Sequence, residues 1–102
     1  MALVAFVVNR TLLRDPRRFL QRCRAAAEDR GWDPWFGPAS DAQDSQEMAR
    51  RAVAAGARLV FAAGGDGTVR ACAEALAGTG VPLAIVPLGT ANLTARALGV
   101  PA

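Results

Sequence analysis

The chain is 102 residues long, enough for one small domain with a single core and too short for two. It contains no histidine and no lysine, which excludes within it a Ser-His-Asp triad, a histidine zinc site and a P-loop lysine. Its net charge of +3 is carried by arginine, which suits phosphate groups or an anionic membrane surface. For most of the arginines, however, we expect solvated helix faces.

Apolar residues make up 52% of the chain and are spread along it, so we expect residues 1–102 to fold as one globular domain. The apolar start, residues 1–8, is too short to span a membrane and lacks the flanks of a signal peptide. We expect a cytoplasmic protein, at most peripheral at the inner membrane surface. Cys23 and Cys72 have no metal-ligand spacing and are predicted to be reduced thiols.

The first predicted strand, residues 3–8, is a short valine-rich run typical of a strand buried on both faces. A helix is predicted after it, because Asp15 is a good N-cap and Pro16 fits the first helical position. Gly31 is expected to end this helix in the left-handed conformation. The apolar stripe of the helix consists of Phe19, Leu20, Cys23 and Ala27.

We expect residues 32–36 to form a strand at a sheet edge, because Pro34 cannot donate a hydrogen bond to a neighbouring strand. The next helix is predicted to begin with Ser40 or Asp44 as its N-cap, since each is followed three residues later by Gln or Glu. Gly56 is expected to end it. Its acids lie early and its arginines late, which matches the helix dipole; these residues are Asp41, Asp44, Glu47, Arg50 and Arg51.

Residues 59–63 are predicted to form a third strand, and a helix follows with Gly78 and Gly80 at its end. The predicted buried face of that helix consists of Val69, Cys72, Ala73 and Leu76. Residues 83–86 are predicted as a fourth strand, with a short helix from about residue 92 to 98. This alternation predicts an α/β fold: a three-layer, Rossmann-like open sheet, mainly parallel, with helices on both faces.

Three loops with unusual chemistry follow predicted strands: NRT at residues 9–11, GGDGT at 64–68 and PLGTAN at 87–92. Because ligands gather at the carboxyl ends of parallel strands, we expect these loops to be neighbours in space. The three glycines of the second loop lack a Cβ, so phosphate oxygens can approach the backbone N–H groups. The helix that follows points its positive end at the same place, which predicts phosphate binding.

Asp66 lies among these glycines, and a carboxylate facing phosphates is repelled unless a cation lies between them or it accepts a proton from a hydroxyl. We therefore expect Asp66 to take part in Mg²⁺ coordination or in activating a nucleophile. Thr68 would cap the helix or donate its hydroxyl to phosphate. Thr90 and Asn92, beside Gly89, offer a second set of donors.

A GGDG segment is also typical of a plain tight turn, since Gly and Asp are common turn residues. The loop at residues 87–92 repeats the order of strand, glycine, hydroxyl and helix one crossover later, which favours a ligand site. Neither loop has the spacing of the common dinucleotide or P-loop motifs.

From the loop at Asn9 through GGDGTVRACAEAL to VPLAIVPLGTANLTARALGVP, nearly the whole chain resembles the catalytic-domain family of diacylglycerol kinases, which includes sphingosine kinases and bacterial lipid kinases. The GGDGT segment is shared with NAD kinases. The discriminating part is its pairing with P-x-G-T-x-N-x-x-A-R, formed here by Pro87, Gly89, Thr90, Asn92, Ala95 and Arg96.

The resemblance implies ATP-dependent phosphorylation of a lipid hydroxyl with Mg²⁺, with diacylglycerol as the expected acceptor and phosphatidic acid as the product. Ser40 lies about where the family has a threonine that contacts ATP, although a plain N-cap role is an alternative. Asp66 would be the catalytic residue and the metal ligand. Together with the loops above, the candidate nucleotide-binding residues are Asn9, Ser40, Gly64, Gly65, Asp66, Gly67, Thr68, Val69, Arg70, Gly89, Thr90 and Asn92.

Three departures from the family pattern matter. The first loop lacks the usual Asn-Pro and glycine, because Arg10 follows Asn9, and Arg70 replaces an asparagine that often ends the GGDGT segment. The family's second, β-rich domain, which carries a carboxylate base, further Mg²⁺ ligands and much of the lipid site, would begin where this chain stops. The chain alone is therefore expected to hold half an active site and to be inactive in isolation.

Two alternatives remain at this point. An NAD kinase relative would carry an Asn-Glu pair downstream of the glycine loop, whereas the one asparagine there, Asn92, is followed by Leu93. A non-catalytic nucleotide-binding or interaction module is the other, and the surface that would pack on a second domain would then be free for assembly into a homo-oligomer. No nucleic-acid partner is expected.

Overall fold

Four strands alternate with three α-helices in residues 1–88, the part of the chain that the computed structural model describes. The predicted short helix at residues 92–98 lies outside these residues. In chain order the elements are β1 (Leu3–Asn9), the 3₁₀ turn η1 (Arg10–Leu12), α1 (Pro16–Asp29), β2 (Asp33–Ala39), α2 (Ala42–Ala54), β3 (Leu59–Gly64), α3 (Asp66–Leu76) and β4 (Leu83–Pro87).

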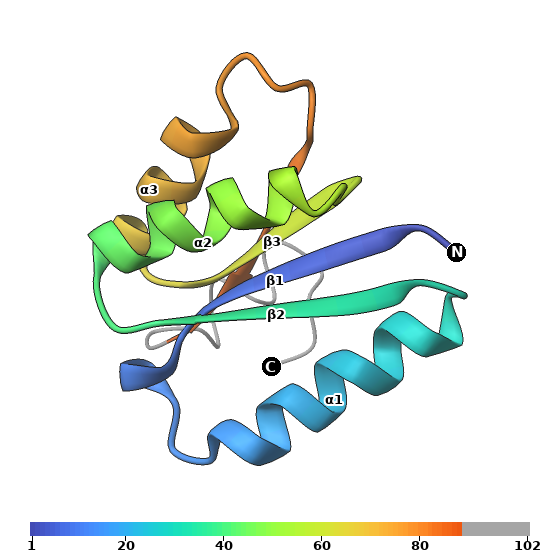
Figure 1. The fold of residues 1–102 in the computed structure, drawn as a ribbon. Helices are drawn as coiled ribbons and strands as arrows, with labels where there is room; N and C mark the ends of the chain where they lie inside the picture. Colours follow the sequence, from blue (N-terminus) through green and yellow to red (C-terminus); the bar gives the residue numbers. More distant parts are fainter. Residues whose placement is uncertain (89–102) are drawn as a thin grey trace.

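The strands form one sheet in the order β2-β1-β3-β4, and every neighbouring pair is parallel. Helices α2 and α3 cover one face of the sheet, and α1 covers part of the other (Figure 1). This arrangement confirms the predicted three-layer, Rossmann-like α/β fold. All four strands run in the same direction, so the loops that lead from strands into helices lie at one edge.

Strand β1 is central in the sheet and buried on both faces, as the valine-rich run predicted. Its side chains alternate between the two faces: Ala5 and Val7 pack beneath α2 and α3, whereas Val4, Phe6 and Val8 point toward the α1 side. One strand therefore contributes to two separate cores.

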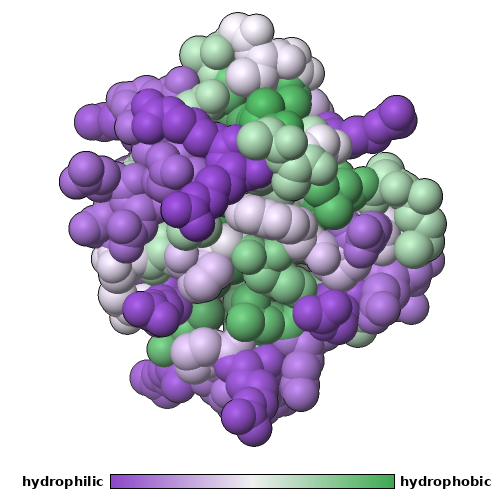
Figure 2. Space-filling model, viewed as in Figure 1, coloured by the Kyte–Doolittle hydropathy of each residue, from purple (hydrophilic) through white to green (hydrophobic). Residues whose placement is uncertain are grey.

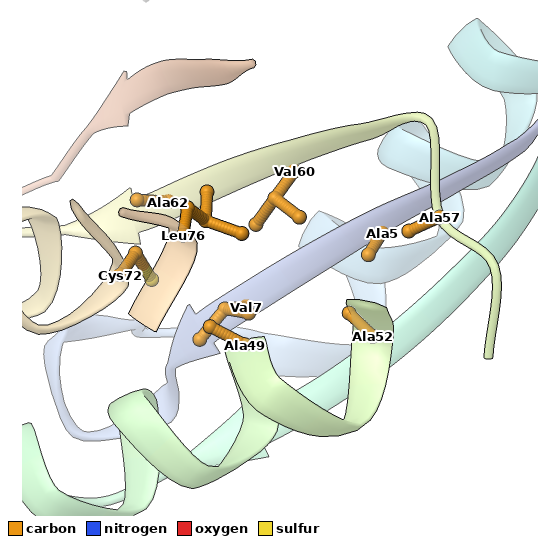
Figure 3. Close-up of a cluster of buried hydrophobic side chains, with 9 residues drawn as sticks. All are labelled: Ala5, Val7, Ala49, Ala52, Ala57, Val60, Ala62, Cys72 and Leu76. Atoms are coloured by element: carbon orange, nitrogen blue, oxygen red, sulfur yellow. The ribbon is translucent and has the colours of Figure 1, made fainter. Parts of the chain in front are cut away.

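The core beneath α2 and α3 consists mainly of small residues (Figure 3). Ala49 and Ala52 of α2 are fully buried there, together with Cys72 of α3. Gly37 of β2 belongs to the same contact, since a Cβ on it would lie 2.9 Å from Met48 Cβ. Small side chains let α2 lie close to the sheet, and the helix is held by close packing.

The core on the α1 side is aromatic. Phe6 pairs with Phe36 on β2 and with Phe61 on β3 in the strand register, so the three rings form a row across the sheet. The ring centroids lie 5.3 Å apart for Phe6 and Phe36 and 4.9 Å apart for Phe6 and Phe61. Stacking of this kind adds to the free energy gained by burial.

The two cysteines are free thiols, as predicted, and the sheet keeps them apart. Cys23 packs on the α1 side, whereas Cys72 is fully buried beneath α3. Burial raises the pKa of each thiol to about 11.

Strand β2 lies at a sheet edge, as predicted, but it runs to Ala39 and not to residue 36. The prediction stopped early because Gly37 and Pro38 are typical of a turn. The backbone N–H of Asp33 donates to the Ala2 carbonyl oxygen, so the N–H positions of residues 34 and 38 point away from β1. Proline at these two positions costs the sheet no hydrogen bond.

Two predictions about the helices were wrong in detail. The N-cap of α2 is Asp41, whose side chain accepts a hydrogen bond from the Asp44 backbone N–H at 2.7 Å, and neither Ser40 nor Asp44. Ala73 was expected to be buried but is exposed, whereas Ala71 is buried. The reason is that α3 packs against α2 as well as the sheet, which turns its buried arc toward Ala71.

The ends of α1 and α2 follow the prediction. Gly31 and Gly56 adopt positive φ angles of 72° and 93°. After α1, the backbone N–H of Trp32 donates to the Ala27 carbonyl and that of Gly31 to Glu28, which is the Schellman arrangement. These glycines send the chain back across the sheet.

Candidate functional site

The carboxyl ends of all four strands meet at one edge of the sheet, on the left of Figure 1. Asn9 at the end of β1 pairs with Ala39 at the end of β2, and Gly64 at the end of β3 pairs with Pro87 at the end of β4. The Leu88 N–H donates to the Gly64 carbonyl at 3.3 Å. The structure therefore brings the loops after β1, β2 and β3 together at the end of β4.

Three of the predicted site residues, Gly89, Thr90 and Asn92, lie outside residues 1–88. The strand that leads to them ends beside the glycine loop, because Pro87 pairs with Gly64.

Helix α3 begins at this edge without a side-chain cap. Its N-cap is Gly65, which has no side chain to accept a hydrogen bond, whereas Asp15 caps α1 and Asp41 caps α2. The N–H groups of the first helical turn have no acceptor within a helix, so a capless start leaves them available to a ligand. The helix dipole adds positive potential at the same place, and an anion fits both features.

The three glycines of the loop do different things. A Cβ on Gly64 would lie 2.7 Å from Thr68 Cβ and would contact Thr68 Oγ1, so this glycine permits close packing of α3 onto β3. A Cβ on Gly65 or Gly67 would meet no atom within 4 Å. These two positions are open on the outside, and a bulky group can approach their backbone.

The side chains of Thr68 and Val69 are turned into the protein and do not face this edge. Thr68 is 3% exposed and is the third residue of α3, so it is not the N-cap that was one of its two predicted roles. Val69 packs its side chain against the core beneath α2 and α3, and its N–H already donates to the Gly65 carbonyl at 3.1 Å.

Asp66 is the first residue of α3 and is exposed at the open edge. An acid at this position is favourable for the helix itself. Within residues 1–88 no group of three or more His, Cys, Asp or Glu side chains could hold a metal ion. Asp66 can thus supply a single carboxylate, which suits Mg²⁺ bound mainly through phosphates and water.

Ser40 follows β2, and its hydroxyl donates to Asp44 Oδ2 at 2.7 Å. The Ser40 backbone N–H donates to the same oxygen at 3.3 Å. These two hydrogen bonds lower the pKa of Asp44, and Arg10 across the edge lowers it further. Because the hydroxyl proton is held by a carboxylate, Ser40 Oγ offers lone pairs to any further partner. Asp44 was predicted as a candidate N-cap and as an early acid of the helix, and its contact with Ser40 was missed.

Asn9 has a local structural role that the sequence pattern did not predict. Its Oδ1 accepts hydrogen bonds from the Thr11 N–H at 3.1 Å and the Thr11 hydroxyl at 2.6 Å. The side chain thereby caps the turn η1, which leaves its amide N–H groups as possible ligand donors.

Arg70 lies one turn into α3 and lines a groove of about 470 Å³ between α2 and α3, next to Gly67. Gln46 of α2 bridges the two helices by donating to Glu74 Oε2 at 3.1 Å. Arg70 is exposed there and has no carboxylate within 4 Å among the residues described. A cation thus stands beside the capless start of α3.

Comparison with known proteins decides the family. The sequence profile described as the diacylglycerol kinase catalytic domain matches residues 4–102, nearly the whole chain. The chain belongs to the diacylglycerol kinase catalytic-domain family. The resemblance noted from the two glycine motifs is confirmed.

Relatives within this family carry lipid kinase names. A probable lipid kinase YegS-like of Pseudomonas fluorescens is 48% identical over 86 residues, which cover 79% of this chain and 29% of that protein. A diacylglycerol kinase of Mycobacterium tuberculosis is 42% identical over 77 residues, which cover 76% of this chain and 25% of that protein. The chain thus spans between a quarter and three tenths of the length of these two relatives.

Membership of this family places the chain with lipid kinases, which are phosphotransferases. None of the helices in the described part of the chain has the length and hydropathy of a membrane span.

Proposed function

We propose that this chain is the ATP-binding domain of a lipid kinase that transfers the γ-phosphate of ATP to a lipid hydroxyl. Diacylglycerol is the proposed acceptor and phosphatidic acid the product. The observation that carries the proposal is the capless start of α3 behind two open glycines, in a chain of the diacylglycerol kinase catalytic-domain family. Such a helix start is a ready site for phosphate.

In this proposal the triphosphate lies against the backbone of Gly65 and Gly67, with their missing side chains allowing close approach. The N–H groups of the first turn of α3 bind phosphate oxygens, and Arg70 adds positive charge from the groove beside them. Asp66 holds Mg²⁺, which when bound neutralises charge on the phosphate oxygens. Gly89, Thr90 and Asn92 supply further donors, as their family motif implies.

The other end of the nucleotide is proposed to lie over the start of α2. Ser40 Oγ is an acceptor there because its proton is held by Asp44, and a carboxylate repels phosphate. A ribose hydroxyl, which can donate, suits this position. The difference in charge between the starts of α2 and α3 would therefore fix the direction in which ATP lies along the edge.

The acceptor site is proposed to come from the part of the family's length that this chain does not span, since the chain covers 29% of its Pseudomonas fluorescens relative. The chain alone would then bind Mg-ATP without transferring phosphate. Catalysis needs the lipid hydroxyl in line with the γ-phosphate and a base to accept its proton.

Calorimetry with Mg-ATP tests the nucleotide site. We expect both variants to weaken binding about tenfold or more: the side chain added in Gly65→Val blocks the approach of phosphate to the backbone, and Asp66→Ala removes the carboxylate that holds Mg²⁺. Asp29→Ala, which removes an exposed acid at the far end of α1, is the matched control and should bind like the parent. Unchanged affinity in both site variants would sink the proposal.

The acceptor is tested with the full-length protein. Incubation with ATP and either diacylglycerol vesicles or NAD should yield phosphatidic acid and no NADP. Formation of NADP would instead support the NAD kinase alternative, and nucleotide binding without product from any acceptor would support a non-catalytic module.

A further inference from the structure

A groove of about 470 Å³ lies between α2 and α3 and opens beside Gly67, at the capless start of α3. Both helices begin at the carboxyl edge of the sheet and pack against each other, so they run in the same direction (Figure 1). The side chains that α2 contributes to the groove are neutral, whereas α3 contributes one cation and one anion, Arg70 and Glu74. These two charges therefore decide what the groove offers to an anionic ligand.

Arg70 and Glu74 are spaced for an ion pair but do not form one. They lie four residues apart, which places them on the same face of α3, one turn from each other. Arg70 nevertheless has no carboxylate within 4 Å in residues 1–88, and residues 89–102 contain no Asp or Glu. On α2 the same spacing does give a pair, since Arg51 Nε lies 3.3 Å from Glu47 Oε1. Another contact therefore holds Glu74.

That contact comes from Gln46 on α2. Its Nε2 donates a hydrogen bond to Glu74 Oε2 at 3.1 Å, across the groove. The surface over α2 is hydrophilic (upper left in Figure 2), and ion pairs in such exposed surroundings are weak. The pair is weaker still when the cation precedes the anion along a helix. One amide hydrogen bond is therefore enough to direct Glu74 toward α2 and to leave Arg70 without a carboxylate partner.

We propose that Gln46 is a positioning residue of the nucleotide site: it holds Glu74 away from Arg70 and thereby keeps the Arg70 guanidinium available to phosphate. This proposal rests on the proposed function, in which Arg70 adds positive charge beside the triphosphate. Without the Gln46 amide, Glu74 turns toward Arg70 and pairs with it. A phosphate of the ligand must then displace an internal carboxylate before it can bind the guanidinium.

A purely structural role for the same hydrogen bond predicts a different pattern of mutational effects. If the bridge serves only to hold α2 against α3, its loss from either side has the same effect. If it serves Arg70, the two sides differ, because removing Gln46 releases a carboxylate whereas removing Glu74 deletes it. Substitution by Met distinguishes these roles, since Met has nearly the length of Gln and Glu but carries neither an amide donor nor a charge.

Calorimetry with Mg-ATP at low salt, on the 102-residue chain, tests the proposal. Gln46→Met should weaken binding about two- to fivefold, which corresponds to the strength of an exposed ion pair. Glu74→Met should bind at least as tightly as wild type, and Gln46→Met/Glu74→Met should match Glu74→Met. The loss in Gln46→Met should shrink as salt is raised, because salt screens exposed charges. The matched control is Glu28→Met, which removes an exposed acid from α1 on the opposite side of the sheet and should bind like wild type.

Arg70→Met shows whether the effect of Gln46 passes through the arginine. It should weaken Mg-ATP binding by itself, and adding Gln46→Met should then cause no further loss. Equal losses in Gln46→Met and Glu74→Met would overturn the proposal and support a structural bridge. An unaffected Gln46→Met, or a loss in Gln46→Met that persists when Arg70 is replaced, would also overturn it.

A measurement without nucleotide distinguishes this proposal from the proposed function. In Gln46→Met, NMR should show slower exchange of the Arg70 Nε–H with water, because Glu74 then accepts a hydrogen bond from it. The change should disappear in Gln46→Met/Glu74→Met. A wild type that binds Mg-ATP, together with unchanged Arg70 exchange in Gln46→Met, would refute the positioning role alone. A wild type that does not bind Mg-ATP would refute the proposed function and this role with it.

Discussion

Gly64 and Gly65 are neighbours in the chain, but a side chain on each would meet opposite surroundings. On Gly64 a Cβ would clash with Thr68, whereas on Gly65 it would meet no atom within 4 Å. We therefore expect Gly64→Ala to lower the free energy of unfolding by about 1–3 kcal/mol through overpacking. Gly65→Ala should leave it nearly unchanged and weaken Mg-ATP binding. Urea unfolding followed by circular dichroism gives the free energy of unfolding of both variants.

If Gly65→Ala destabilised the protein as much as Gly64→Ala, the loop would serve folding alone. The tight-turn interpretation of GGDG would then hold.

The contact between Ser40 and Asp44 predicts a pH effect. The folded-state pKa of Asp44 is lowered mainly by hydrogen bonds from Ser40, so this contact stabilises the fold above the unfolded pKa of about 3.9. The stabilisation is lost as the pH falls through the folded value. In Ser40→Ala, carboxyl NMR should show a higher Asp44 pKa, and the stability difference from wild type should vanish in acid. An unchanged Asp44 pKa would contradict the assigned hydrogen bond.

At the scale of elements, α2 approaches the sheet where Gly37 faces it. A Cβ on Gly37 would lie 2.8 Å from Trp35 Cζ3 and 2.9 Å from Met48 Cβ. Gly37→Ala should therefore destabilise the protein by ~1–3 kcal/mol. Adding Met48→Ala should recover part of that loss, and a double-mutant cycle by urea unfolding measures the coupling. Strict additivity of the two changes would show that the helix does not meet the strand there.

Helices α1 and α3 each bury a thiol, which predicts a loss of stability in alkali. Because burial raises the folded-state pKa of Cys23 and Cys72 to about 11, the folded protein holds their protons longer than the unfolded chain, whose thiols have a pKa of about 8.5. The contribution is present below that value and lost as the pH rises toward 11. Thermal unfolding in this range should show a falling midpoint, less so in Cys72→Ala after allowing for its cavity.

The sequence predicts the bounds and burial of these elements where local interactions determine them. It does not predict them where contacts between distant segments determine them. The helix ends at Gly31 and Gly56 are local and were predicted. The extension of β2 through Pro38 was not, because it depends on which N–H groups face β1. The exposure of Ala73 depends on the packing of α3 against α2. The helical periodicity of the sequence gives no information about that contact.

The features of the candidate site likewise fall into those that the sequence predicts and those that only the fold reveals. The glycine loop was evident from its sequence, and the structure places it at the expected edge beside the loops after β1 and β2. The groove beside Arg70 required two helices to be brought together, so only the fold reveals it. The different roles of Gly64 and Gly65 likewise became clear only with Thr68 in place.

At the scale of the whole molecule, nucleotide binding should raise stability by mass action. Mg-ATP at 100 times its dissociation constant would add about 2.7 kcal/mol, which for a chain of this size raises the unfolding temperature by roughly 10–20 °C. Tripolyphosphate with Mg²⁺ should give a smaller rise, because it lacks the nucleoside proposed to lie over α2. Differential scanning calorimetry of wild type and Asp66→Ala distinguishes these cases. An equal rise in the unfolding temperature of Asp66→Ala would show that the Asp66 carboxylate takes no part in the nucleotide site.

Helix α1 carries Arg17 and Arg18 in its first turn and Glu28 and Asp29 in its last, so these charges oppose the helix dipole. A helix that carries arginines at its positive end is held by its apolar stripe against its own electrostatics, so its amides should exchange hydrogen sooner than those of α2. By thermodynamic reciprocity, whatever neutralises Arg17 and Arg18 must make α1 harder to open. Contact with a charged surface would then slow exchange throughout this helix, including turns that never touch the surface.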